Sequence, residues 1–395
     1  MTTHERAPAA ATGQHDLSSL LVETRRLLGS AAEDVPRGVA VADWLRISRV
    51  AEATGDSNPL FLDPRHGVRT WWRTMVAPPA FVLAIAVPES AGALHARPYG
   101  AVDLLCHIEL WWDDHIHLGD RVAGDVRLLR AERGPPWRGR ETVEITSRSV
   151  FRSGGREVAS ATGVVRVHPL RLSQELFVER DLHRYGPGEV GDLIRRLDAE
   201  PCPRGARPRF ADDVFVGEAL PDVVRGPLTW SDLITWIIAE GRPALAGNLH
   251  HRELAAQPGR VIANAATGWP ISDRRHARED LQACTSVGFP APCARPALVV
   301  ALATQVVTTW MGDDGFLRHL AASLEAPVLY GDVLSLSGQV IDKLTQRSAG
   351  KVYSGVWIET QARNQLGERV LTARALVFLP RPGQPVEVPV SGAAP

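Results

Sequence analysis

The sequence has few cysteines and no surplus of charge of either sign. Its 395 residues include four cysteines, no two of which form a Cys-x-x-Cys pair. This scatter argues against a disulfide framework and a cysteine-type zinc site, and it is typical of a protein of the reducing cytoplasm. The 44 Lys and Arg residues balance 45 Asp and Glu residues, which gives a formal net charge of −1. The chain therefore lacks the excess of positive charge that is typical of proteins that bind nucleic acids or anionic membranes.

Long hydrophobic segments are also missing. The longest apolar run, 297–310, is interrupted by Thr304 and Gln305 and is too short to span a bilayer, so we expect a buried helix there. Residues 1–14 include charged side chains and lack an apolar core of signal-peptide length, so we expect a loose tail. No glycine-rich phosphate loop follows a strand and opens a helix, and no set of metal ligands has a suitable spacing. The sequence therefore predicts a protein without a cofactor or a metal, and without membrane association.

The most informative segment is 51–63, Ala-Glu-Ala-Thr-Gly-Asp-Ser-Asn-Pro-Leu-Phe-Leu-Asp. Apolar residues at helical spacing predict a helix over 41–54, and Gly55 is a natural stop just past its end. Asp56 then stands at the helix exit, in a backbone that Asn58 and Pro59 fix. A carboxylate held in this way can act as a general acid/base. The alternative is a structural carboxylate that caps the loop, which the same turn residues would serve equally well.

The run from Gly55 to Leu60, Gly-Asp-Ser-Asn-Pro-Leu, resembles the signature of MaoC-like, R-specific enoyl-thioester hydratases and dehydratases. In that family a His follows this Leu, and the Asp and His together manage the water that is added or removed. Phe61 stands at the histidine position in this chain. The resemblance implies the α+β hotdog fold, in which a curved antiparallel sheet wraps a long central helix. It also implies a substrate that is an acyl thioester, carried on CoA or an acyl carrier protein.

The order helix, overhanging loop, second short helix and strands occurs twice, which indicates duplication at the domain scale. Alternating polar and apolar residues predict strands in the first half over 101–112, 120–132, 141–153 and 156–167. In the second half we expect a helix over 230–240 that Thr229 caps. The further elements expected there are the buried helix 297–310 and strands over 332–343, 351–364 and 369–379.

The second half also resembles the second hotdog of two-domain MaoC-like acyl dehydratases, through residues 288–292, 310–315 and 330–332. We therefore predict a double hotdog. Its predicted parts are a flexible tail (1–20), an N-terminal hotdog domain (21–172), a linker (173–209), a C-terminal hotdog domain with a degenerate motif (210–382) and a second flexible tail (383–395).

A group other than the motif histidine must assist Asp56 if the family chemistry is kept, because one positioned acid/base partner contributes about 100- to 10,000-fold in rate. The candidates are His66, His115 and His117. The last two lie two residues apart near a strand end and share one face. The alternative for this pair is a solvated strand edge.

Five residues are candidates for contact with the substrate: Asn58, Phe61, Trp72, Ala80 and Phe81. Phe61 is either an apolar wall facing the substrate or plain core, and a dry environment there would raise the pKa of Asp56. The resemblance implies that a backbone N–H near Ala80 and Phe81 polarises the thioester carbonyl. In the second half, Pro296 stands near the equivalent position and has no N–H to donate.

The second half departs further from the motif. Alignment of 239–242 with 53–56 puts Arg242 at the position of the carboxylate, which leaves Glu240, His250 and His251 as weaker candidates. Asp313 and Asp314 look like a carboxylate pair, but a helix followed by Gly-Asp-Asp-Gly is more simply a C-terminal turn.

Three functions remain open. The first is a MaoC-like hydro-lyase with Asp56 as its main acid/base. The second keeps the fold for a cyclisation, isomerisation or dehydration in specialised, polyketide-like metabolism, because Phe61 and Arg242 both depart from the motif. The third is a non-catalytic protein that binds acyl chains or stabilises a partner. Association into a homodimer is compatible with each of them.

Overall fold

A computed structural model of the chain describes residues 17–28, 38–88, 101–171, 174–241, 247–256, 261–263, 267–272, 280–281, 283–348 and 350–390. Its N-terminal half contains α1 (Leu17–Arg26), β1 (Gly38–Val41), α2 (Trp44–Thr54), α3 (Pro59–Leu62), α4 (Pro64–Arg69), α5 (Phe81–Ile85), β2 (Ala101–Trp112), β3 (Arg121–Trp137), β4 (Arg140–Ser153) and β5 (Arg156–Pro169). The remaining elements are α6 (Pro187–Asp198), η2 (Ala211–Asp213), β6 (Val223–Arg225), α7 (Trp230–Ala239), α8 (Gly247–Ala255), β7 (Val261–Ala263), β8 (Pro270–Ser272), η4 (Cys284–Val287), α9 (Pro296–Met311), β9 (Phe316–Leu324), β10 (Leu334–Ser348), β11 (Lys351–Arg363) and β12 (Arg369–Leu379).

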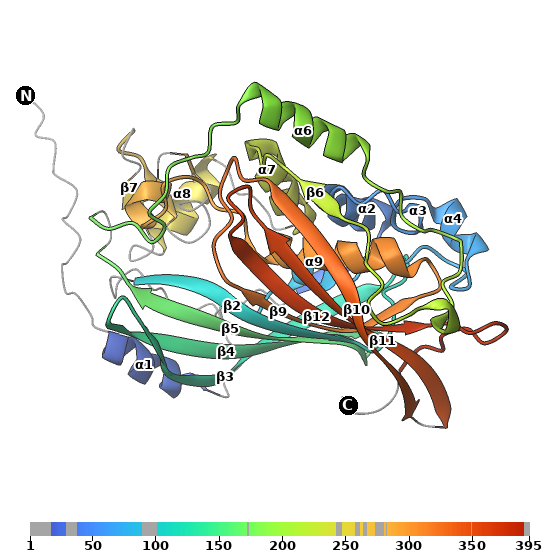
Figure 1. Ribbon diagram of the computed structural model, residues 1–395. Coiled ribbons are helices and arrows are strands. Elements are labelled where there is room, and N and C mark those ends of the chain that lie inside the picture. Colours follow the sequence, from blue (N-terminus) through green and yellow to red (C-terminus); the bar gives the residue numbers. More distant parts are fainter. Residues whose placement is uncertain are drawn as a thin grey trace, which may run out of the picture.

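One antiparallel sheet joins the two halves. Its ten strands lie in the order β1-β3-β4-β5-β2-β9-β12-β11-β10-β6. The joint is the β2–β9 pair, whose register runs from His107 opposite Ser323 to Trp111 opposite His319. Figure 1 shows this sheet curving beneath the helices, with α9 and α2 on the same side of it. Two curved sheets that share an edge in this way, each with its own helices, form a double hotdog.

The longest helix among the described residues is α9, and it is the core of the C-terminal half. All of its residues after Pro296 are buried, and it packs on β9, β10, β11 and β12. An apolar helix without a polar face is stable only when other elements cover it on every side. The prediction of a buried helix over 297–310 is therefore confirmed.

The predicted long helix over 41–54 is shorter in the structure. Val41 belongs to β1, where it pairs with Arg121, and the helix α2 begins only at Trp44. The Asp43 carboxylate fixes this start, because it accepts a hydrogen bond from the Arg46 N–H at 2.8 Å. The buried helix of the N-terminal half is instead α5, which has five residues.

Helices α2 and α7 pack against each other and end alike, which supports the duplication. Gly55 follows α2 with φ +68° and Gly241 follows α7 with φ +60°, both in the left-handed region that favours glycine. A Cβ added to Gly55 would lie 3.1 Å from the Arg225 Nε, and one added to Gly241 would lie 3.0 Å from the Arg46 Cζ. An arginine therefore closes the end of each helix.

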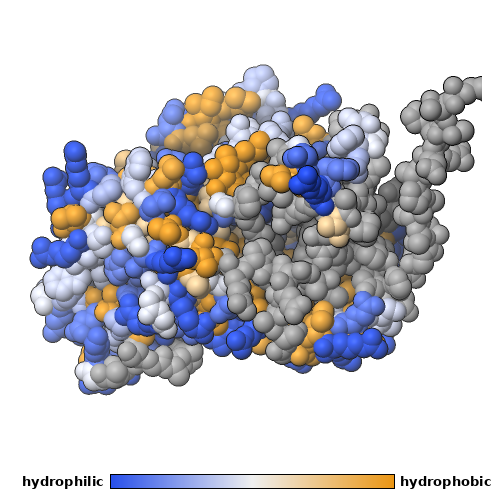
Figure 2. All heavy atoms as spheres, turned by 180° about the vertical axis from the view of Figure 1, so that it is seen from behind, coloured by the Kyte–Doolittle hydropathy of each residue, from blue (hydrophilic) through white to orange (hydrophobic). Residues whose placement is uncertain are grey.

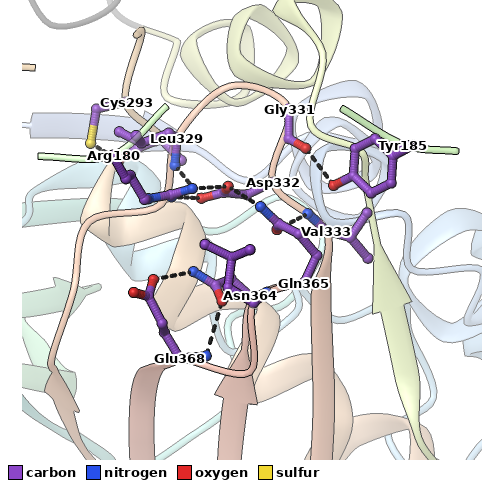
Figure 3. Close-up of polar contacts among 12 residues, drawn as sticks. Arg180, Tyr185, Cys293, Leu329, Gly331, Asp332, Val333, Asn364, Gln365 and Glu368 are labelled. Carbon is purple, nitrogen blue, oxygen red and sulfur yellow. Dashed lines mark hydrogen bonds and ion pairs between the residues drawn. The ribbon is translucent and has the colours of Figure 1, made fainter. Parts of the chain in front are cut away.

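The segment between the halves is clasped to the start of β10. Figure 3 shows Arg180 pointing at Asp332, a carboxylate that is 1% exposed, and the Arg180 Nη1 donates to the Asp332 Oδ1 at 2.9 Å. The Tyr185 hydroxyl donates to the Gly331 carbonyl at 2.7 Å, and the Gln365 amide donates to the Asp332 Oδ1 at 2.9 Å. The clasp holds the predicted linker, which contains α6, against the C-terminal half.

The two predicted tails are shorter than expected. Helix α1 begins at Leu17, and Leu20 is buried against the β3–β4 side of the sheet, so the N-terminal tail cannot extend to residue 20. At the other end Val386 and Val390 are buried in the main core, and the Val390 N–H donates to the Asp113 carbonyl at 2.7 Å. The prediction of a flexible tail from 383 is therefore wrong for 383–390, because these residues bury apolar side chains.

The surface of the described residues mixes polar and apolar side chains. Figure 2 shows hydrophobic groups separated by hydrophilic ones on the face opposite to that of Figure 1. No helix among the described residues has the length and hydrophobicity that would let it cross a membrane.

Candidate functional site

Asp56 is a buried carboxylate at the end of α2. It is 5% exposed, and its backbone N–H donates to the Ala51 carbonyl at 2.8 Å. The Asn58 N–H donates to the Asp56 Oδ1 at 2.9 Å, while the Asn58 Oδ1 accepts from the Leu60 N–H at 3.0 Å and starts α3. The Gly-Asp-Ser-Asn-Pro sequence thus folds into two successive side-chain-capped turns. These turns hold the carboxylate in one orientation.

Burial raises the pKa of Asp56 from 3.8 to about 6, because the charged form loses its hydration. The Asn58 N–H, the Arg225 guanidinium and the Thr308 hydroxyl each act in the opposite direction. Thr308 lies on α9, where its Oγ1 is also 3.1 Å from the Gln305 carbonyl oxygen, so the hydroxyl can donate to only one of these two acceptors, Asp56 or Gln305, at a time. Asp56 is therefore mostly ionised at neutral pH but close enough to its pKa to exchange a proton in either direction.

Arg225 from the C-terminal half fixes the segment that carries Asp56. Its Nε donates to the Thr54 carbonyl at 2.6 Å and its Nη2 to the Gly55 carbonyl at 3.1 Å. Its Nη1 donates to the Glu200 Oε2 at 2.6 Å. The carbonyls at the end of α2 are thus satisfied by a side chain from the other half of the molecule.

His66 lies on α4, which follows the Gly-Asp-Ser-Asn-Pro turns. The Asp63 Oδ1 caps this helix by accepting from the Arg65 N–H at 2.8 Å. The His66 Nε2 lies 2.7 Å from the Asp313 Oδ2. Asp313, which follows α9, is 1% exposed, and burial raises its pKa while His66 and the Asn58 amide act to lower it. Two residues that are 247 positions apart thus form a direct pair.

Trp72 and His115 lie beside this pair. The Trp72 Nε1 donates to the Asp313 carbonyl at 2.6 Å, and its ring meets the His115 ring edge-on with 4.2 Å between centroids. Burial, followed by the nearby His117, lowers the pKa of His115 to about 3, so its imidazole is neutral at physiological pH. His115 also packs on Phe316, at 5.0 Å between centroids.

His117 lies between His115 and Asp120. Its ring is 6.4 Å from that of His115, and its Nδ1 lies 3.8 Å from the carboxylate of Asp120. The structure therefore gathers the predicted residues Asp56, Asn58, His66, Trp72 and His115 around the end of α2 and the residues after α9, and leaves His117 at the margin.

The three apolar candidates are buried. Phe61 is 2% exposed, Ala80 2% and Phe81 0%, and all belong to the main hydrophobic core. For Phe61 this favours the core alternative over a wall facing the substrate. The Phe81 N–H donates to the Pro78 carbonyl at 2.9 Å, which leaves the Ala80 N–H as the better candidate for an oxyanion donor.

The C-terminal half has a salt bridge at the corresponding helix end. Glu240 is 3% exposed, pairs with Arg295 and accepts from the Trp236 Nε1 at 2.9 Å. Both of these contacts engage the carboxylate with neighbouring side chains of its own half. His251 is exposed on α8, whereas Arg242 and the side chain of His250 lie outside the described residues.

The sequence did not predict Asp313, Thr308 or Arg225 as parts of the site. For Asp313 the available signal was its position just after a helix that is apolar on every face. A buried charge without a partner is costly there, so a partner for this carboxylate could have been expected. Among the described residues no group of three or more His, Cys, Asp or Glu side chains is arranged to hold a metal ion.

Comparisons with solved structures define the class of fold. A MaoC-like dehydratase is similar over 89% of this chain and 100% of its own, with 17% identity and a TM-score of 0.59. A putative MaoC domain protein dehydratase from Chloroflexus aurantiacus is similar over 90% and 98%, with 12% identity and a TM-score of 0.51. The fold is thus that of MaoC-like double hotdogs, and the predicted fold class is confirmed.

Sequence comparison gives one further relation. The chain matches no protein-family model. It is 30% identical over 120 residues to a UPF0336 protein of Streptomyces avermitilis, a match that covers 30% of this chain and 69% of that protein. The chain therefore belongs to the UPF0336 family, whose name states no activity.

Proposed function

We propose that the protein is a hydratase/dehydratase of acyl thioesters, with Asp56 as its principal acid/base. The observation that carries the proposal is the state of this carboxylate, which is buried, fixed by the Asn58 N–H and has a pKa raised to about 6. The likeness in fold to MaoC-like dehydratases supports the class of substrate, an acyl thioester on CoA or an acyl carrier protein.

In dehydration, a base removes a proton from C2 of a 3-hydroxyacyl thioester, and the C3–O bond breaks as the hydroxyl takes up a proton and leaves as water. Hydration is the reverse. An ionised Asp56 supplies the base in one direction, and the same group, once protonated, supplies the acid in the other. The thioester oxygen needs a donor while the enolate forms, and the Ala80 N–H at the start of α5 is the group proposed for it. Substitution of Ala80 by Pro would remove that donor.

The test is turnover of a panel of trans-2-enoyl and 3-hydroxyacyl thioesters, followed by the absorbance of the conjugated thioester. Asp56→Asn should lose about 100- to 10,000-fold in kcat. Glu52→Gln is the matched control, because Glu52 is an exposed carboxylate on the same helix, and it should keep full activity. Equal rates for Asp56→Asn and wild type would refute the role of Asp56. Absence of turnover in all three proteins would refute the hydratase/dehydratase and favour a specialised tailoring substrate or a binding role.

A further inference from the structure

The pair formed by His66 and Asp313 supplies what the motif of the N-terminal half lacks. Phe61, at the motif's histidine position, is packed in the core, and its side chain has no group that could serve as an acid or a base. His66 follows five residues later, on α4, and its side chain is 21% exposed. An imidazole is therefore present five residues beyond the motif's histidine position, and it is held by a different element, α4.

Asp313 is fixed from three directions. Its N–H donates to the Gly205 carbonyl at 3.0 Å, and its own carbonyl accepts from the Trp72 Nε1 at 2.6 Å. Its Oδ2 lies 2.7 Å from the His66 Nε2. Its Oδ1 is buried and has no hydrogen-bond partner of normal geometry among the described residues. A buried carboxylate with one oxygen committed to an imidazole fixes the orientation of that ring.

Asn58 connects this pair to Asp56. Its backbone N–H donates to the Asp56 Oδ1 at 2.9 Å, and its side-chain amide lies near enough to Asp313 to lower the pKa of that carboxylate. The two carboxylates thus flank one asparagine. One comes from the end of α2 in the N-terminal half and the other from the residues after α9 in the C-terminal half.

We propose that His66 is the second acid/base of this site, and that Asp313 is the positioning residue that holds its ring through Nε2. The inference rests on the proposed function. With Nε2 facing Asp313, Nδ1 is the nitrogen left to exchange a proton with the C3 hydroxyl while Asp56 exchanges one with C2. In dehydration Asp56 gains the proton from C2 and His66 loses one to the leaving hydroxyl. Asp56 then releases its proton to solvent and His66 takes one up from solvent, so that both groups return to their starting states. The site is then composite and needs both halves of the chain.

The test compares four variants, His66→Gln, Asp313→Asn, the double variant and Asp314→Asn, on the thioester that the wild type turns over. Asp314 is the matched control, because it is the adjacent carboxylate and is half-buried. Asp313→Asn should lower kcat about 10- to 1,000-fold with KM nearly unchanged, and the double variant should be no slower than His66→Gln. Asp314→Asn should stay within about twofold of wild type.

A second readout does not depend on activity. With 15N-labelled histidine, the hydrogen-bonded Nε2–H of His66 should give a downfield, exchange-protected signal. This signal should disappear in His66→Gln and Asp313→Asn and persist in Asp314→Asn. The contact from Trp72 to the Asp313 backbone carbonyl survives each substitution, so thermal unfolding should confirm that the variants fold.

The outcomes separate the two proposals. Absence of the downfield signal in the wild type, multiplicative effects in the double variant, or an Asp313→Asn rate equal to that of Asp314→Asn would each overturn the assignment of His66 and Asp313 and leave the hydratase/dehydratase in place. A wild type that turns over no thioester would instead refute the proposed function, and the assignment of His66 as an acid/base would fall with it.

Discussion

The raised pKa of Asp56 predicts that its replacement by Asn stabilises the protein at neutral pH. In the unfolded chain the carboxyl has its ordinary pKa of 3.8, whereas in the folded protein the pKa is about 6. A native group with a raised pKa binds more protons than the unfolded chain between these two values, so stability falls as pH rises through this window. Above about pH 6 both states are ionised, and the folded state bears the full cost of a buried charge.

The magnitude follows from the two pKa values. A difference of about two pKa units corresponds to about 3 kcal/mol in total, and about 1.4 kcal/mol of this arises between pH 5 and pH 7.5. For a chain of this length the unfolding entropy is about 0.8 kcal/mol per kelvin. The advantage of Asp56→Asn in Tm should therefore grow by about 2 °C between pH 5 and pH 7.5.

The assay is thermal unfolding of wild type, Asp56→Asn and the control Glu52→Gln over this pH range. Subtraction of the wild-type curve removes the contribution of all other titrating groups, and the Glu52→Gln difference should be flat. A flat difference for Asp56→Asn as well would show that Asp56 titrates normally. Burial would then not raise the pKa of Asp56, whatever the effect of the variant on turnover.

Other predictions concern the groups that hold the site. Arg225→Met removes a cation that lowers the pKa of Asp56, so that pKa should rise further and the acid limb of the kcat/KM pH profile should move to higher pH. Gly55→Ala should lower the free energy of unfolding by about 1 to 2 kcal/mol because of its φ of +68°, and by more because of a steric contact with Arg225. Gly367→Ala is its control, since that glycine has φ +78° but open space around it. Equal losses of stability for the two variants in denaturant unfolding would contradict the contact. Trp72→Phe leaves a buried carbonyl without its donor and should cost about 1 to 3 kcal/mol in the same measurement, and a loss below about 0.5 kcal/mol would contradict the importance of that bond.

The parts of the fold that sequence predicted are those with a local pattern. The strands over 101–112 and 369–379 were predicted at their observed bounds, because part of each, 107–112 and 371–375, alternates between buried and less buried positions. Strand β9 was missed. Its first five residues are all buried, since it lies in the middle of the ten-stranded sheet, and a strand covered on both faces does not alternate.

The residues of the candidate site likewise divide into those that lie in a local sequence motif and those that only the folded chain brings together. Asp56 and Asn58 were predicted because they lie in one short turn motif. Asp313 was interpreted as part of a C-terminal turn, which it also is, and its pairing with His66 depends on the docking of one half against the other. Contacts that span 247 residues leave no periodicity or spacing in a single sequence. Arg225 was missed for the same reason.

The chain that links the two halves, which meet at the β2–β9 joint, has a consequence for how such a protein responds to dilution and to mutation. When two separate chains build a composite site, its population depends on their concentration, whereas a covalent link holds the two parts at an effective concentration that dilution does not change. A substitution in two identical subunits would alter both sites at once. In this chain a substitution alters only one of the two halves. The end of α7 therefore has the salt bridge between Glu240 and Arg295, whereas the end of α2 has Asp56, a carboxylate whose pKa is near neutrality.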